Sequence, residues 1–368
     1  MDQHKSVIVP KYQNICMATS NVVLKYPKMS GVGAVSVKEK TKIIIKNALK
    51  YISGVKKDRF NWSNAHMIIG LQNAYEYNKD PSVIDMIEKY YDHWHHFGSK
   101  INVIDNVMNG YSLLYLYDIK NKSSYLKMIN KMISYIDNSP KDKLNSLPYR
   151  MRCPDIYIDS LGMICPFLCK YSSIFNKPQY SELAIDQILS FHEYGFDKKS
   201  GLPYHGYYFG KSEKYGIIGW VCAIGWIMIS FSDSREYISI DNIRQDQLVE
   251  LFTNLSNTMI QYQKGNGAFS WQITVVGRPD DISVTCMITY SILKGIKLNV
   301  LPQLFMSNVN RATYYLLSGT SDDGFVNNCS AEREGFSRYP QRYGWYPWGQ
   351  GYTLALLSNI LITEDVSA

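Results

Sequence analysis

Apolar residues recur at helical spacing along most of the chain, whereas the strict alternation typical of strands is rare. Residues 271–276 are one short strand candidate. Pro178 opens a clear helical segment, at a position where the first turn of a helix tolerates proline. The apolar side chains of that segment share one helical face: Tyr180, Leu183, Ala184, Ile188 and Phe191. The pattern therefore predicts an all-helical protein.

The periodic segments predict twelve helices, with ends placed to within a few residues. They cover about residues 40–53, 62–78, 82–97, 106–118, 123–137, 158–174, 178–193, 219–232, 244–263, 281–295, 302–317 and 348–360. No linker rich in Pro, Gly or Ser divides the chain. We therefore expect residues 1–38 to form an irregular lead-in and residues 39–368 to form a single domain.

The connections between these helices alternate between short and long. Connections that leave the even-numbered helices are mostly short, whereas those that enter them are mostly long, as at 138–157 and 194–218. Helix pairs that recur in this way can close into a double ring, an (α/α)6 barrel, although an open α-solenoid would share the pattern. Long loops gathered at one end of a ring usually build a site, so we expect function at that end.

Composition and charge exclude some function classes. The net charge of +7 comes from scattered Lys and Arg rather than a basic stripe, which argues against a nucleic-acid partner. The chain start lacks the apolar core of a signal peptide, and the apolar stretch 217–231 is too short to span a membrane comfortably. The seven Cys are dispersed, which is typical of a reduced protein. We therefore expect a cytoplasmic protein without a membrane partner.

Polar and aromatic residues that suit sugar chemistry stand where the long loops enter the even-numbered helices. Tryptophan rings stack on sugars, and carboxylates bind hydroxyls and move protons. If the ring closes, these side chains converge on one pocket. They are Trp62, Asp105, Asp159, Trp220, Trp226, Asp281, Ser283 and Trp348, with His205 in the loop 194–218. The sequence suggests no metal and no cofactor, because its His residues lack a zinc spacing and its Gly-rich segments lack a nucleotide motif.

Each candidate also has a purely structural explanation. An Asp at a helix start often caps the helix, which leaves the role of Asp105 open, and His205 could be a satisfied loop histidine. Asp159 stands out because the apolar sequence LGMICPFL follows within its helix. Burial among such residues would raise the pKa of its carboxyl group, which suits a general acid.

Several segments together resemble one family, the unsaturated glucuronyl and rhamnogalacturonyl hydrolases of glycoside hydrolase families 88 and 105. The central motif is YIDSLGMICPFL, with Asp159 as its third residue, and GLPYHG with His205 follows at the family's spacing. DISVTCM resembles a later motif, although Asp281 stands where the family usually has Glu. PWGQG with Trp348 resembles the closing motif, and the segments around Trp62 and Asp105 fit more loosely.

The resemblance implies an (α/α)6 barrel and an unusual reaction. The family's substrates carry a 4,5-unsaturated uronic acid at the non-reducing end. An Asp protonates the C4=C5 bond and helps water add at C5, after which the product rearranges and the glycosidic bond opens. The matching residue is Asp159, and Asp105 matches a second carboxylate that holds sugar hydroxyls. No metal or organic cofactor is implied.

The chain departs from the family at a position that binds substrate. The family has Trp-x-Arg-Gly-x-x-Trp where this chain has Trp220-Val-Cys222-Ala-Ile-Gly-Trp226, so Cys222 replaces the Arg. Tyr149 replaces an upstream basic residue, although Arg150 and Arg152 are near. Losing a cation that binds an anionic sugar costs about 1–3 kcal/mol. The departure therefore indicates a different substrate, a cation supplied elsewhere, or decayed activity.

Two other functions stay open at this stage. The same barrel could act on a capsular or surface polysaccharide with a different sugar, an alternative that the altered segment between Trp220 and Trp226 motivates. The chain could also be a non-catalytic sugar-binding protein. All three hypotheses share an oligosaccharide ligand.

Overall fold

The computed structural model describes residues 36–54, 60–209, 213–239, 241–275 and 277–367. Most of the predicted lead-in, residues 1–35, lies outside the described residues, so the division into a lead-in and a single domain stays a prediction. The described helices are α1 (Val37–Ser53), α2 (Trp62–Asn78), α3 (Pro81–Phe97), α4 (Ile104–Val107), α5 (Asn109–Lys120), α6 (Ser123–Asn138), α7 (Asp159–Phe175), α8 (Pro178–Gly195), α9 (Val221–Arg235), α10 (Gln245–Tyr262), α11 (Ile282–Lys297), η2 (Gln303–Phe305), α12 (Met306–Ser318) and α13 (Pro347–Ser367).

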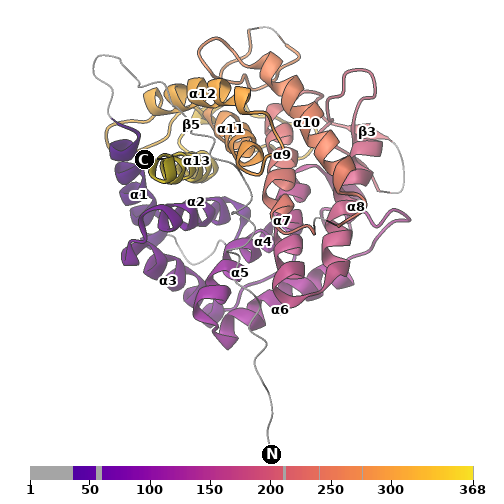
Figure 1. The fold of residues 1–368 in the computed structure, drawn as a ribbon. Helices are drawn as coiled ribbons and strands as arrows, with labels where there is room; N and C mark the ends of the chain where they lie inside the picture. Colours follow the sequence, from indigo (N-terminus) through magenta and orange to yellow (C-terminus); the bar gives the residue numbers. More distant parts are fainter. Residues whose placement is uncertain (1–35, 55–59, 210–212, 240, 276, 368) are drawn as a thin grey trace, which may run out of the picture.

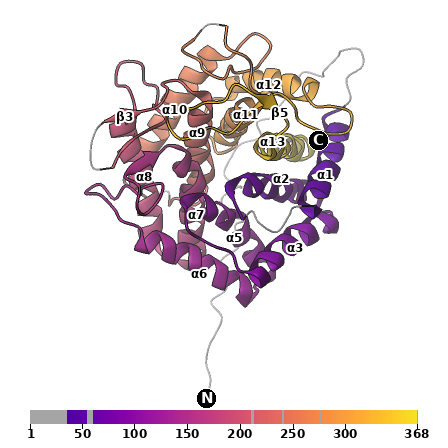
Figure 2. The ribbon, with the colours of Figure 1, turned by 180° about the vertical axis from the view of Figure 1, so that it is seen from behind.

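These helices form two concentric rings (Figures 1 and 2). The inner ring runs α2, α5, α7, α9, α11 and α13, and α13 packs along α2 to close it. The outer ring consists of α1, α3, α6, α8, α10 and α12, each against a neighbouring inner helix. The closed double ring confirms the predicted (α/α)6 barrel, because the first and last inner helices of an open solenoid would not touch.

All twelve predicted helices occur close to their expected positions. The fourth, expected at about 106–118, is divided at Met108 into the short α4 and the longer α5. Residues 271–275 form no named strand, and Gln272 pairs with Trp220 through an isolated bridge, while residue 276 lies outside the described residues. The sequence pattern missed five short strands, which are β1 (Asp155–Tyr157), β2 (Gly206–Tyr208), β3 (Lys214–Tyr215), β4 (Cys329–Ser330) and β5 (Tyr343–Gly344).

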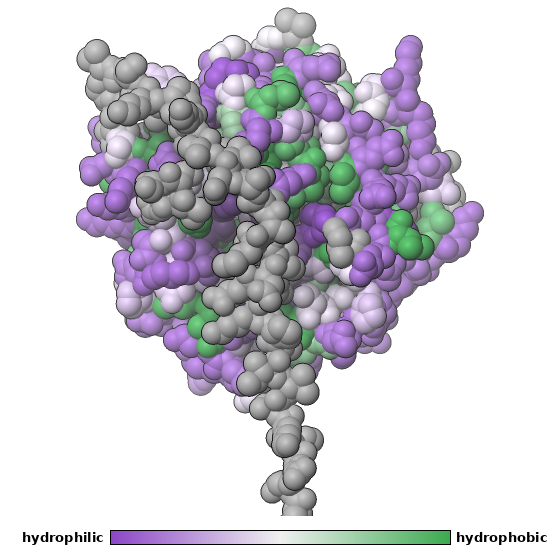
Figure 3. All heavy atoms as spheres, viewed as in Figure 1, coloured by the Kyte–Doolittle hydropathy of each residue, from purple (hydrophilic) through white to green (hydrophobic). Residues whose placement is uncertain are grey.

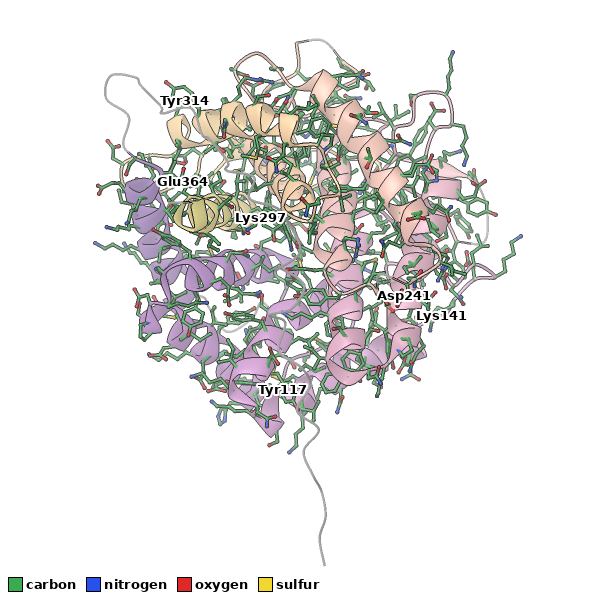
Figure 4. The ribbon with its side chains drawn as sticks, in the orientation of Figure 1. Tyr117, Lys141, Asp241, Lys297, Tyr314 and Glu364 are labelled. Carbon is green, nitrogen blue, oxygen red and sulfur yellow. The ribbon has the colours of Figure 1, made fainter. Side chains whose placement is uncertain are left out.

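The inner and outer helices differ in how much of their surface is buried. In α7, every residue from Asp159 to Ser172 is buried, as expected for a helix surrounded by neighbours. Outer helices bury one face only, and Tyr314 on α12 is 61% exposed and points away from the ring (Figure 4). The face seen in Figure 3 is correspondingly mostly hydrophilic, with small separate apolar patches. No helix among the described residues is long and apolar enough to cross a membrane, and the expected cytoplasmic location stays a prediction.

Glycines permit the closest contacts inside the ring. A Cβ atom on Gly351 of α13 would collide with the carbonyl of His66 on α2, so the two backbones can approach only because position 351 has no side chain. In the same way, a Cβ atom on Gly162 of α7 would lie 2.5 Å from the ring of Trp226 on α9. These two contacts bring the starts of α2, α7, α9 and α13 together.

The short strands lie in the long loops that precede inner helices. β1, β2 and β3 form an antiparallel sheet from the loops before α7 and α9. β4 and β5 pair within the loop that leads from α12 to α13. The strands thus tie together the loops at the end of the barrel where the sequence predicts the site.

Candidate active site

A hollow opens among the starts of the inner helices. The structure brings five of the predicted site residues to its wall, namely Asp159, Trp62, Trp220, Trp226 and Trp348. The rest of the wall consists of His66, Tyr149, Met163, Cys222, Met287, Ser330, Ala331, Glu332 and Arg333. The hollow therefore combines an aromatic lining with a small number of ionisable groups, as sites for small polar ligands do.

Strand pairing places His205 beside Asp159. β1 and β2 run antiparallel with Tyr157 opposite Gly206, and the amide of Ile158 donates to the carbonyl of His205 at 3.0 Å. One residue later the chain enters α7 at Asp159. The ladder therefore holds the two side chains side by side, although 46 positions separate them in sequence.

Asp159 is the first residue of α7 and does not cap the helix. One carboxylate oxygen, Oδ2, lies 3.0 Å from Nε2 of His205, and the other, Oδ1, lies 3.5 Å from Nη2 of Arg333. Burial alone would raise the pKa of this carboxyl group, but the charge of Arg333 and the contact with His205 outweigh burial and lower the pKa to about 2. The expectation of a raised pKa is therefore wrong, because it considered burial without a neighbouring cation.

The hydrogen bonds of His205 assign its tautomer. Burial lowers the pKa of the imidazole to about 4, so the ring is neutral at pH 7 and carries one N–H. Nδ1 lies 2.6 Å from the hydroxyl of Tyr339, which in turn accepts from the amide of Ile217 at 3.4 Å. Tyr339 therefore donates to Nδ1, and the ring N–H is on Nε2, facing Asp159. His205 orients Asp159, and the positive charge beside that carboxylate at pH 7 is the charge of Arg333.

Arg333 lies on the wall of the hollow, and the sequence analysis did not name it as a site residue. It stands in the loop before α13, where its guanidinium lies 4.3 Å from the ring centre of Tyr157. The ring of Phe336 stacks on the ring of Tyr157, with the two ring centres 4.0 Å apart. The signal was present in the sequence, because the segment 329–342 crowds charged and aromatic residues into a long loop that enters an inner helix.

Asp105 lies behind the wall of the hollow rather than on it. Its Oδ2 accepts a hydrogen bond of 2.6 Å from the hydroxyl of Tyr149, and Tyr149 itself lines the hollow. Burial raises the pKa of Asp105 to about 6, against the opposing effects of Tyr149 and Arg333. The pKa values of Asp105 and Asp159 are thus pushed in opposite directions, a common sign of different roles in proton transfer.

Aromatic rings form the rest of the wall. Trp62 packs against Trp348 with ring centres 4.8 Å apart, and His66 packs against Trp226 at 4.8 Å. The indole N–H of Trp220 is buried and has no hydrogen-bond partner among the described residues. Both ring nitrogens of His66 likewise lack a partner within the described part of the chain. Both side chains belong to the wall of the hollow.

Asp281 and Ser283 were predicted to bind substrate, but the structure places both outside the wall of the hollow. Asp281 caps α11, where Oδ1 accepts from the amide and the hydroxyl of Ser283 at 2.9 and 2.6 Å. The same oxygen accepts from the amide of Ser330 at 3.2 Å, and Trp348 donates to the carbonyl of Ser330. The pair therefore fixes the strand that leads to Arg333.

The structure also locates the positions where the sequence departs from the family pattern. The thiol of Cys222 lines the hollow and carries no positive charge there. Arg150 and Arg152, which the sequence suggested as substitutes, are both exposed and absent from the wall. Among the described residues, no group of His, Cys, Asp and Glu side chains is arranged to hold a metal ion.

One family of known proteins matches most of the chain. The sequence profile of Glycosyl Hydrolase Family 88 matches residues 35–363, nearly the whole chain. The chain belongs to this family. It is therefore a glycoside hydrolase rather than a non-catalytic sugar-binding protein, and its substrate is a saccharide.

Individual relatives are distant in sequence but similar along their whole length. The unsaturated rhamnogalacturonyl hydrolase YesR of Bacillus subtilis is 21% identical over 329 residues, which cover 83% of this chain and 90% of that protein. A possible member of family 105 from Klebsiella pneumoniae superposes with a TM-score of 0.83 at 17% identity, covering 94% and 97% of the two chains. A glycoside hydrolase of family 105 from C. acetobutylicum ATCC 824 gives a TM-score of 0.78 at 22% identity, with 87% of this chain and 99% of that chain covered. These solved structures share the fold.

Proposed function

We propose that this protein hydrates the C4=C5 bond of a 4,5-unsaturated uronic acid at the non-reducing end of an oligosaccharide, with Asp159 as general acid and base. One observation carries the proposal: Asp159 presents a buried carboxyl group, oriented by His205, to a hollow walled by tryptophans. YesR is by name an unsaturated rhamnogalacturonyl hydrolase, and the family resemblance around Asp159 points to the same substrate class.

The reaction needs one proton and one water molecule. Asp159 gives its proton to C4, and the positive charge that develops at C5 is shared with the ring oxygen. Water then bonds to C5 and returns a proton to Asp159, which acts as a general base in this half of the reaction. The hemiketal opens by breaking the bond between C5 and the ring oxygen, and C1 becomes a hemiacetal that releases the second saccharide. The overall balance is the consumption of one water molecule.

An adjoining groove offers room for the second saccharide. It shares Ala331, Glu332, Arg333 and Trp348 with the hollow and continues outward over exposed and half-buried residues. Its further lining combines aromatic rings with polar groups, as sugar sites do: Tyr51, Asn61, Ser63, Glu334, Arg342, Trp345, Tyr346 and Pro347. We place the unsaturated sugar in the hollow and the saccharide that leaves in this groove.

The test is a screen of purified protein against unsaturated disaccharides produced by several polysaccharide lyases. The conjugated double bond absorbs ultraviolet light, so hydration is followed as loss of that absorbance. We expect turnover of at least one unsaturated disaccharide and no action on its saturated counterpart. Action on saturated glycosides alone would instead favour the alternative, an enzyme of capsular or surface polysaccharide metabolism with a different sugar.

A further inference from the structure

We propose that Arg333 binds the carboxylate of the unsaturated sugar, and that it gives up its ion pair with Asp159 to do so. The inference rests on the proposed function, because it assigns a residue to the acidic group of that substrate. Cys222 stands where the family has a substrate-binding Arg, and Arg333 would supply the missing positive charge from another position.

The guanidinium of Arg333 makes only a loose ion pair in the structure. Its Nη2 lies 3.5 Å from Oδ1 of Asp159, beyond the 2.7–2.9 Å that is typical of a close charge-assisted hydrogen bond. Among the described residues no oxygen accepts a hydrogen bond from this side chain, and its other contacts are the ring faces of Tyr157 and Tyr149. The side chain is held in place but keeps its hydrogen-bond donors for a ligand.

The charges around the hollow restrict how an anionic sugar can bind to the hydrogen-bond donors of Arg333. The wall carries the carboxylates of Asp159 and Glu332, and Asp105 lies just behind Tyr149. Arg333 is the one Lys or Arg on that wall within the described chain. An anionic sugar would be repelled by the carboxylates unless it reached Arg333, so an acidic ligand has one favourable orientation.

That orientation also positions the reacting atoms. In a 4,5-unsaturated uronic acid the carboxylate is attached to C5, and C4 is the next ring atom. Binding the carboxylate at Arg333, whose guanidinium lies beside Asp159, therefore holds C4 close to the Asp159 carboxyl group.

When Arg333 exchanges Asp159 for the substrate carboxylate, the pKa of Asp159 also changes. In the structure the charge of Arg333 lowers the pKa of Asp159 and keeps the carboxyl group ionised. A substrate carboxylate that shares Arg333 places a second negative charge nearby and withdraws part of the cation's effect, and both changes raise the pKa of Asp159. Substrate binding thus favours uptake of the proton that the first step requires, while His205 continues to orient the group.

The test is a binding experiment that does not depend on turnover. The probes are a disaccharide that ends in a saturated 4-deoxy uronic acid and the methyl ester of the same compound, both lacking the double bond. Calorimetry compares the unsubstituted protein with Arg333→Gln and Arg333→Lys. Arg338→Gln is the matched control, because Arg338 belongs to the same loop but pairs with Glu334 at the exposed surface.

We expect the unsubstituted protein and Arg338→Gln to bind the acid at least about tenfold more tightly than the ester. Arg333→Gln should bind both alike, and Arg333→Lys should keep part of the preference, because Lys retains the charge but not the planar fork. An unchanged preference in Arg333→Gln, or no preference in the unsubstituted protein, would overturn the inference. If Arg333→Gln does not fold, an unreduced preference in Arg333→Lys would have the same meaning.

The outcome is separable from that of the proposed function. Preference for the acid through Arg333, without hydration of any unsaturated disaccharide, would refute the hydration activity and leave the carboxylate site standing. Hydration with an acid preference that is independent of Arg333 would refute the carboxylate site alone.

Discussion

Nη2 of Arg333 lies 3.5 Å from Oδ1 of Asp159, on the opposite carboxylate oxygen from the one that faces His205. The two neighbours act differently on the same group. His205 is neutral at pH 7 and fixes the direction of the carboxylate, whereas Arg333 sets its charge. The candidate acid is therefore ionised in the structure, so the proposed first step requires it to take up a proton when the substrate binds.

Asp105 should make the stability of the protein depend on pH. Burial raises its pKa from 3.8 to about 6, so the folded state binds this proton more tightly than the unfolded chain does. The stability that the protonated carboxyl group contributes is complete below pH 3.8 and is lost as the pH rises through about 6. Asp105→Asn cannot ionise, so at pH 7.5 its free energy of unfolding should exceed that of the unsubstituted protein by up to about 3 kcal/mol.

Urea denaturation between pH 4.5 and 7.5 measures this difference. The gap between Asp105→Asn and the unsubstituted protein should narrow as the pH falls toward 4.5. If the free energies of unfolding of the two proteins changed in parallel with pH, the pKa of Asp105 would be the same in the folded and unfolded chain, and this prediction would be wrong.

Tyr339→Phe should impair turnover more than substrate binding. The hydroxyl of Tyr339 donates to Nδ1 of His205, and without it the ring can move its proton to Nδ1 and turn a bare nitrogen toward Asp159. Losing one such bond corresponds to about 1–1.5 kcal/mol, or a kcat lower by about tenfold. Steady-state kinetics should show a much smaller change in KM. Tyr343→Phe is the control, because the buried hydroxyl of Tyr343 has no partner among the described residues, and an equal loss of kcat in both variants would contradict the proposed role.

Gly351→Ala should destabilise the barrel at its closure. The added Cβ atom would collide with the carbonyl of His66, which forces α13 away from α2 at a cost of about 1–3 kcal/mol. Chemical denaturation checks the loss against Gly265→Ala, where nothing lies within 4 Å of the new atom. Equal free energies of unfolding for the two variants would mean that α13 can move away from α2 without loss of stability, which would contradict the prediction.

Much of the fold follows from local pattern. Helical periodicity located the helices, and the alternation of short and long loops indicated which helices are internal. The strands β1 to β5 could not be predicted, because each is only two or three residues long, too short to show an alternating pattern in the sequence.

The site was predictable where a residue stands at the start of an inner helix, as Asp159, Trp62 and Trp348 do. Asp281 also stands at such a start, yet its side chain turns back to cap α11, and a sequence cannot distinguish these two orientations. Arg333 was missed because its position comes from the fold of the loop before α13. Because the charge of Arg333 was not considered, the pKa of Asp159 was predicted to be raised, whereas it is lowered.

The central claim, that Asp159 transfers a proton to an unsaturated sugar, is tested most directly by comparing Asp159→Asn with the unsubstituted protein on a disaccharide that the latter hydrates. The control is Asp241→Asn at the exposed edge of the molecule (Figure 4). The account predicts that loss of ultraviolet absorbance slows at least about 100-fold in Asp159→Asn and is unchanged in Asp241→Asn, with circular dichroism alike in all three proteins. Full activity in a folded Asp159→Asn variant would contradict it.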